Sequence, residues 1–139
     1  MKKYGKLCGI VALTFLFQAC GETGIPDPNP GGSPGLDFSI NINQSPFTPL
    51  QNVGGSAIAT QQKVIIARLD ATNWAALSSY CPNDPTVSLT YNAADFTFRC
   101  SKDNSVFDHQ GKVKSGSSSN LTRYNTTFTN NTGVLRIFE

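Results

Sequence analysis

Short runs of strand length limit the fold of this chain more than any other feature of its 139-residue sequence. Residues 63–69 (KVIIARL) form an apolar run that is rich in β-branched residues, and Asn130-Asn131-Thr132-Gly133 is typical of a hairpin turn. Candidate strands cover residues 63–69, 87–91, 96–99, 121–129 and 134–138. Residues 72–79 are compatible with a short helical turn. Several short strands at this spacing predict an all-β fold, an antiparallel sandwich or small barrel.

The first 19 residues predict an export signal. Lys2, Lys3 and Lys6 precede an apolar run at residues 7–17. A run of that length is too short to cross ~30 Å of hydrocarbon as a helix of the mature protein, but it suits the hydrophobic region of a signal peptide.

The end of this run, Leu16-Phe17-Gln18-Ala19-Cys20, resembles a bacterial lipobox, although Phe17 is unusual at its position. In that family the cysteine thiol receives a diacylglyceryl group and becomes the N-terminus. The resemblance implies cleavage before Cys20 and membrane anchoring in the bacterial cell envelope, on its periplasmic or outer surface, through several acyl chains at ~0.8 kcal/mol per buried CH₂. The alternative is an ordinary secretory signal followed by a chance cysteine.

Removal of the leader changes the charge of the protein. The whole chain has 11 basic and 9 acidic residues, and loss of three leader lysines leaves 8 against 9, a net charge of −1. No basic patch therefore suggests a nucleic-acid partner. Residues 20–35 are rich in proline and glycine and predict a partly stiff tether, so that the folded domain covers residues 36–139.

The four cysteines divide into two groups. Cys8 leaves with the signal and Cys20 is the lipidation site, so Cys81 and Cys100 remain as one pair in the folded domain. In an exported protein a disulfide persists.

Two segments around these cysteines carry the chemical content of the sequence. Cys81-Pro82-Asn83 is separated by 16 residues from a segment that reads CSKDNSVFDHQG from Cys100. The two segments resemble the loops of Rieske iron–sulfur domains, which read C-x-H and C-x-x-H-G-S-x-[FY]-[DN]-x-x-G. The likeness covers residues 38–138, including Trp74-Ala75-Ala76-Leu77-Ser78 before the first loop. It implies a Rieske-like antiparallel sandwich or small barrel with a two-loop, cluster-binding type of subdomain.

The resemblance also identifies the ligands that this chain lacks. In a Rieske centre two cysteine thiolates hold one iron of a [2Fe–2S] cluster and two imidazoles hold the other. Cys81 and Cys100 stand at the thiolate positions, but Asn83 and Asp103 stand at the histidine positions. Ser105 corresponds to the family serine that hydrogen-bonds a cluster sulfur. An amide oxygen is a weak ligand for iron, whereas a carboxylate is a hard one.

The loss of both histidines predicts a domain without a cofactor, acting as a structural or interaction module. In the family the two sulfurs share one iron and are neighbours, so the resemblance implies a Cys81–Cys100 disulfide, worth ~3 kcal/mol for a loop of about 20 residues. The alternative is an electron-transfer protein with a [2Fe–2S] cluster held by Cys81, Cys100, Asp103 and Asn83. A third possibility is a thiol–disulfide partner, although the C-x-x-C spacing of such enzymes is absent.

Other side chains give little reason to expect an enzyme. His109 is the only histidine, is expected to be exposed in a turn, and lacks a partner serine for a hydrolytic triad. Trp74, Phe96, Phe98 and Phe107 are expected in the core. Cluster-bearing Rieske proteins usually cross the membrane folded behind a twin-arginine signal, whereas this leader has Lys2-Lys3-Tyr4, which favours export unfolded and without a cluster.

Overall fold

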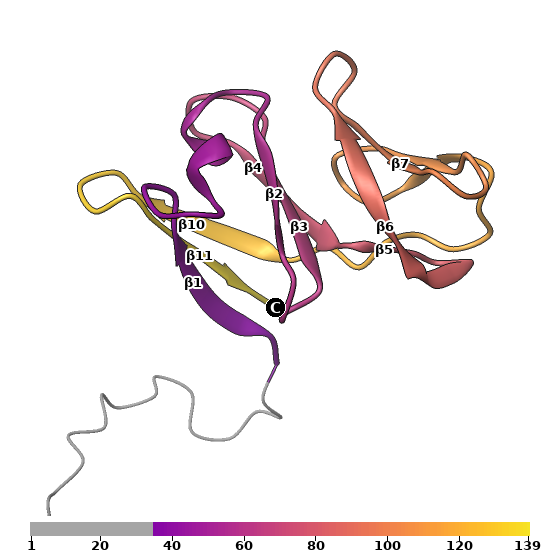
Figure 1. Ribbon diagram of the computed structural model, residues 1–139, viewed down its shortest axis with the longest axis horizontal. Helices are drawn as coiled ribbons and strands as arrows, with labels where there is room; N and C mark the ends of the chain where they lie inside the picture. The colour runs from indigo at the N-terminus through magenta and orange to yellow at the C-terminus, as the bar shows by residue number, and fades with distance from the viewer. Residues whose placement is uncertain (1–34) are drawn as a thin grey trace, which may run out of the picture. The chain divides into compact units, whose positions relative to one another are not determined.

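The computed structural model describes residues 35–139, which form eleven β-strands and one short 3-10 helix, η1 (Thr48–Gln51). The strands pair antiparallel in three sheets (Figure 1), so the predicted all-β antiparallel fold is confirmed. The sheets do not close into a barrel. Within residues 35–139 no helix is long and apolar enough to cross a membrane. The predicted signal peptide, Cys20 and the tether up to residue 34 lie outside the described residues.

The first sheet joins the two ends of the described chain. Its strand order is β1 (Asp37–Asn41), β11 (Val134–Phe138), β10 (Asn125–Thr129). The predicted hairpin between β10 and β11 is confirmed, and Gly133 in its turn has a φ of +68°, a backbone conformation that glycine adopts without strain. Leu135 and Ile137 alternate with exposed or half-buried neighbours and are fully buried.

The second sheet is the middle layer and consists of β2 (Ser56–Ala59), β3 (Val64–Arg68) and β4 (Trp74–Ser78). Alternate residues of β3 belong to different hydrophobic clusters. Ile66 packs in the cluster that includes Leu135, and Ile65 packs in the cluster that includes Phe98. The sheet is therefore covered on both faces, which explains why its strands are continuous apolar runs instead of alternating ones.

Residues 72–79, whose sequence is compatible with a short helical turn, instead contain strand β4. Ala75 and Leu77 face one core while Trp74 and Ala76 face the other. Alanine and leucine favour helices when isolated, but here burial on both faces of the middle sheet decides the conformation.

The third sheet has the order β5 (Tyr80–Cys81), β6 (Asp84–Asn92), β7 (Thr97–Cys100), β8 (Val106–Phe107), β9 (Val113–Ser115). Its inner face supplies Leu89, Phe98 and Phe107 to the cluster shared with the middle sheet. Figure 1 shows this sheet on the opposite side of β2–β4 from β1, β10 and β11.

Of the four aromatic residues expected in the core, three are buried and Phe96 is not. Trp74 is 7% exposed and Phe98 and Phe107 are fully buried, whereas Phe96 is 42% exposed. Phe96 precedes β7 at the turn from β6 and has a φ of +55°, so its side chain leaves the alternation of the strand that follows. The prediction for Phe96 is therefore wrong.

Candidate functional site

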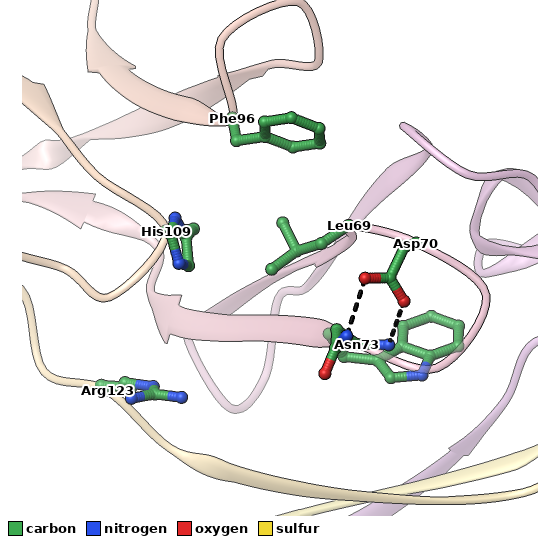
Figure 2. A pocket seen from close by; sticks show the side chains of 7 residues that line it. Leu69, Asp70, Asn73, Phe96, His109 and Arg123 are labelled. Carbon is green, nitrogen blue, oxygen red and sulfur yellow. Dashed lines mark hydrogen bonds between the residues drawn. The ribbon is translucent and has the colours of Figure 1, made fainter.

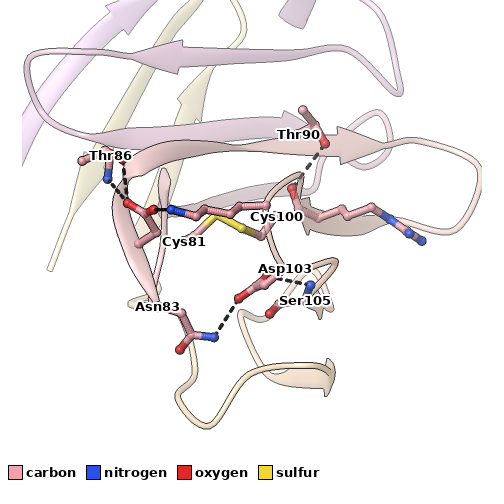
Figure 3. Close-up of a disulfide and its surroundings, with 10 residues drawn as sticks. Cys81, Asn83, Thr86, Thr90, Cys100, Asp103 and Ser105 are labelled. Atoms are coloured by element: carbon pink, nitrogen blue, oxygen red, sulfur yellow. Dashed lines mark hydrogen bonds and ion pairs between the residues drawn. A yellow bond between two sulfur atoms is a disulfide. The ribbon is translucent and has the colours of Figure 1, made fainter.

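The two cysteine segments meet at one end of the third sheet, where a disulfide joins Cys81 to Cys100 (Figure 3). The two Cα atoms are 5.6 Å apart and the side chains are 1% and 0% exposed. β6 lies between β5 and β7 in the sheet, and second-neighbour strands of a regular sheet are ~9.5 Å apart. The register of β5 on β6 shifts between Tyr80 and Cys81, and this irregularity accompanies the approach of Cys81 to Cys100.

A second contact joins the loops at the two positions that the Rieske resemblance assigns to histidine. The Asn83 Nδ2 atom donates a hydrogen bond of 2.7 Å to Asp103 Oδ2. The other carboxylate oxygen of Asp103 accepts the Ser105 backbone N–H at 2.9 Å, and a Cys100–Ser105 backbone hydrogen bond of 2.9 Å closes the turn. Both oxygens of Asp103 are thus occupied by groups of the protein (Figure 3).

These contacts hold the pKa of Asp103 below its ordinary value of 3.8. The largest cause is the Ser105 side chain, followed by the Ser105 backbone N–H and the Asn83 amide. The Ser105 hydroxyl is fully buried and lies close enough to the carboxylate to favour its charged form, although it makes no hydrogen bond of good geometry. The resemblance assigns the Ser105 hydroxyl to a cluster sulfur, but here the hydroxyl makes no hydrogen bond of good geometry, and the contact of Ser105 with its turn is made by its backbone N–H.

An ion pair between Lys102 and Asp84 connects the loops a third time. Asp84 also accepts hydrogen bonds from the backbone N–H and the hydroxyl of Thr86, at 3.0 and 2.6 Å. Lys102 first, and then Thr86, hold the pKa of Asp84 well below its usual range. The Lys102 side chain is 63% exposed, so water screens this pair and its contribution to stability is small. No pattern in the sequence indicates this ion pair.

A loop after β9 packs against the second cysteine segment. Gly116 has a φ of +79°, and a Cβ atom built on it would lie 2.9 Å from the Ser105 Cα atom. Only glycine allows this close approach, which lets the loop of residues 115–119 cover Ser105. Gly116 and Ser105 are distant in the chain, so no local pattern in the sequence indicates their contact.

His109 is exposed, as expected, and does not join the cysteine loops. It lies in the turn between β8 and β9, where the Asp108 carboxylate accepts the backbone N–H groups of Gln110 and Lys112, both at 2.9 Å. His109 lines a separate pocket, together with residues from the β3–β4 turn.

No protein-family model matches the chain, and no curated protein sequence matches it either. The role of the two cysteine loops must therefore be argued from their own residues and from the contacts between them. Within residues 35–139 there is no group of three or more His, Cys, Asp or Glu side chains arranged to hold a metal ion.

The disulfide-bonded loops do not fit a [2Fe–2S] cluster. Such a cluster needs the two sulfurs as separate thiolates, and here they are bonded to each other. Asn83 and Asp103, the only remaining candidate ligands in the two motifs, bind each other. The four side chains at the ligand positions are thus bound to one another: the two cysteines form a disulfide, and the Asn83 amide donates a hydrogen bond to the Asp103 carboxylate.

Replacement of both Cys81 and Cys100 with alanine is expected to lower the free energy of unfolding by ~3 kcal/mol, because the cross-link restricts a loop of about 20 residues in the unfolded chain. Urea denaturation of the mature domain measures the change. The exposed serine Ser119, replaced with alanine, serves as a control and should change the free energy of unfolding by less than ~0.5 kcal/mol. A double cysteine variant as stable as the wild type would contradict the structural role of this disulfide.

Asp103→Asn is expected to destabilise the domain at neutral pH but not in acid. The folded-state pKa of Asp103 is lowered, so its stabilisation is present above pH 3.8 and is lost as the pH falls through the folded-state pKa. Urea denaturation from pH 7 to pH ~2 should show the gap between variant and wild type closing in acid, where both side chains are neutral. A gap that does not change with pH would show that the charge of Asp103 is not involved.

Proposed function

We propose that this protein is a cell-envelope lipoprotein with a Rieske-type domain whose two loops are closed by a disulfide instead of an iron–sulfur cluster, and that it acts as a structural or interaction module. One observation carries the proposal. The residues at the four ligand positions are paired with one another, Cys81 with Cys100 and Asn83 with Asp103.

The physical basis is the replacement of one cross-link by others. In a Rieske centre the cluster bridges the loops, because each loop contributes one thiolate and one imidazole. In this chain each loop contributes one cysteine to a covalent bond and one side chain to a hydrogen bond of 2.7 Å. The Lys102–Asp84 pair adds a contact between the same two segments. These three contacts hold the loops together, so a metal cluster is not needed to link them.

The proposed location follows from the leader and the tether. Acylation of Cys20 would anchor the chain in a membrane, and residues 21–35 separate that anchor from the folded domain. A stretch of this composition in an extended conformation reaches ~45 Å at ~3.1 Å per residue. A partner of the domain must then lie at a membrane surface or within that reach of it.

The electron-transfer alternative requires a different state of the same loops. The disulfide would have to be reduced, and the hydrogen bond between Asn83 and Asp103 would have to break before either side chain could bind iron. An Asp ligand would also add negative charge and lower the potential relative to an imidazole-ligated iron. No contact among the described residues favours this state.

Cluster reconstitution tests the proposal directly. The reduced protein is incubated without oxygen with ferrous iron and sulfide, and bound iron, acid-labile sulfide and visible absorption are measured. The wild type is expected to retain neither iron nor sulfide, because Asn83 and Asp103 cannot replace two imidazoles. The variant Asn83→His/Asp103→His restores both ligand positions and is expected to take up one cluster. Stoichiometric cluster in the wild type would overturn the proposal.

Cell fractionation tests the anchor. Full-length protein is expected in the membrane fraction and to incorporate labelled fatty acid, whereas Cys20→Ser should incorporate none because it lacks the thiol that is acylated. Cys8→Ser, which changes the other leader cysteine, is the matched control and should behave as the wild type. A wild-type protein that incorporates no labelled fatty acid would rule out the lipid anchor.

A further inference from the structure

A pocket of about 400 Å³ lies apart from the cysteine loops, where turns from the middle and third sheets meet (Figure 2). It combines apolar and charged side chains on its walls: Leu69, Asp70, Asn73, Phe96, His109 and Arg123. In Figure 2, Phe96 and Arg123 lie on opposite sides of Leu69, and His109 flanks the same space. The volume is in the range of sites that bind small organic molecules.

The exposure and backbone conformation of Phe96 are the first observations that suggest ligand binding in this pocket. Its side chain is 42% exposed, and its φ of +55° lies in the left-handed region, which costs ~1–2 kcal/mol for a residue of this size. Asparagine or glycine would adopt this turn conformation more easily. Neither core packing nor turn geometry explains a phenylalanine at this position.

The β3–β4 turn forms a fixed wall opposite Phe96. The Asp70 carboxylate accepts the backbone N–H groups of Thr72 and Asn73, at 2.7 and 2.8 Å, and the Asn73 amide at 2.7 Å. The Asn73 amide first, and then these N–H groups, lower the pKa of Asp70 to about 2. Arg68 braces the same turn from behind through the carbonyl oxygens of Asp70 and Ala71. Asp70 is therefore committed to the turn.

Arg123 lies on a segment whose backbone is hydrogen-bonded both to β4 and to the turn between β8 and β9. The residues before and after it hydrogen-bond the edge of β4, from Ser78 N to Thr122 O and from Tyr124 N to Ala76 O, both at 2.9 Å. Leu121 N donates to Gly111 O at 2.8 Å, which attaches the segment to the turn that carries His109. The backbone segments that carry Arg123 and His109 are therefore both held in place by hydrogen bonds.

The side chains of Arg123 and His109 have no hydrogen bond or ion pair within residues 35–139. A guanidinium group presents a planar set of donors that matches a carboxylate in two-point contact. The imidazole of His109 can donate a further hydrogen bond. The ionised Asp70 on the other wall disfavours a doubly charged ligand such as a phosphate monoester, and favours an anion of single charge.

We infer that this pocket binds a small organic carboxylate that carries an aromatic or branched apolar group. Arg123 and His109 bind the carboxylate, and Phe96 and Leu69 contact the apolar group. The site does not involve the cysteine loops, so the inference stands whether or not those loops hold iron.

Titration of the folded, oxidised domain with N-acetylphenylalanine, followed by amide NMR, tests the inference. Shifts are expected at Leu69, Phe96, His109 and Arg123, and the uncharged match N-acetylphenylalaninamide should bind at least ~10-fold more weakly, since a charge-assisted hydrogen bond contributes about that factor. Absence of shifts at these residues up to the solubility of the acid, or equal binding of acid and amide, would overturn it.

Two variants separate ligand binding from folding. Arg123→Gln should weaken binding of the acid at least ~10-fold without affecting that of the amide, whereas the exposed Arg99→Gln should change neither. Phe96→Asn should weaken both ligands and raise the thermal midpoint, because asparagine tolerates the left-handed turn. Val53→Ser, at an exposed residue outside the pocket lining, is the control for surface hydrophobicity. Unchanged binding of the acid by Arg123→Gln would refute the assignment.

Discussion

The bond between Cys81 and Cys100 closes the end of the core that lies between the middle and third sheets. Both sulfurs belong to the same buried cluster as Leu77, Leu89, Phe98 and Phe107. The strands that carry the two cysteines are short, and β5 contains only Tyr80 and Cys81. Two residues of strand supply few backbone hydrogen bonds, so the covalent bond keeps this edge of the sheet in place. The hydrogen bond from Asn83 and the ion pair of Lys102 lie between the same two segments that the disulfide joins.

This arrangement separates two tasks that a metal centre combines. A cluster both cross-links its loops and transfers electrons, and its assembly needs free thiolates together with a source of iron and sulfide. A disulfide cross-links the loops with no cofactor and forms in oxidising compartments, which the proposed export of the chain would provide. The proposal that the domain is an interaction module rests on this division, since the loops have a covalent cross-link while Asn83 and Asp103 stand at the histidine positions of the motif that they resemble.

The sequence allowed the class of fold and several local features to be predicted, because these depend on short-range patterns. The strand run at residues 63–69 contains β3, and the turn at Asn130-Asn131-Thr132-Gly133 joins β10 to β11 as expected. Errors occurred where tertiary contacts override local preference. Trp74–Ser78 is a strand because both of its faces are buried, and Phe96 is exposed because its turn reverses the alternation. The hydrogen bond between Asn83 and Asp103 and the pocket around Arg123 join distant segments, and no spacing in the sequence indicates them.

The central claim is that the two cysteine loops are closed by a bond between their own sulfurs. The most direct test is the intact mass of the protein, purified without reductant or oxygen, before and after alkylation of free thiols. The account predicts a two-hydrogen deficit localised to the peptides that contain Cys81 and Cys100, no alkylation of either residue, and no bound iron. Two alkylated cysteines accompanied by stoichiometric iron and acid-labile sulfide in the purified protein would contradict it.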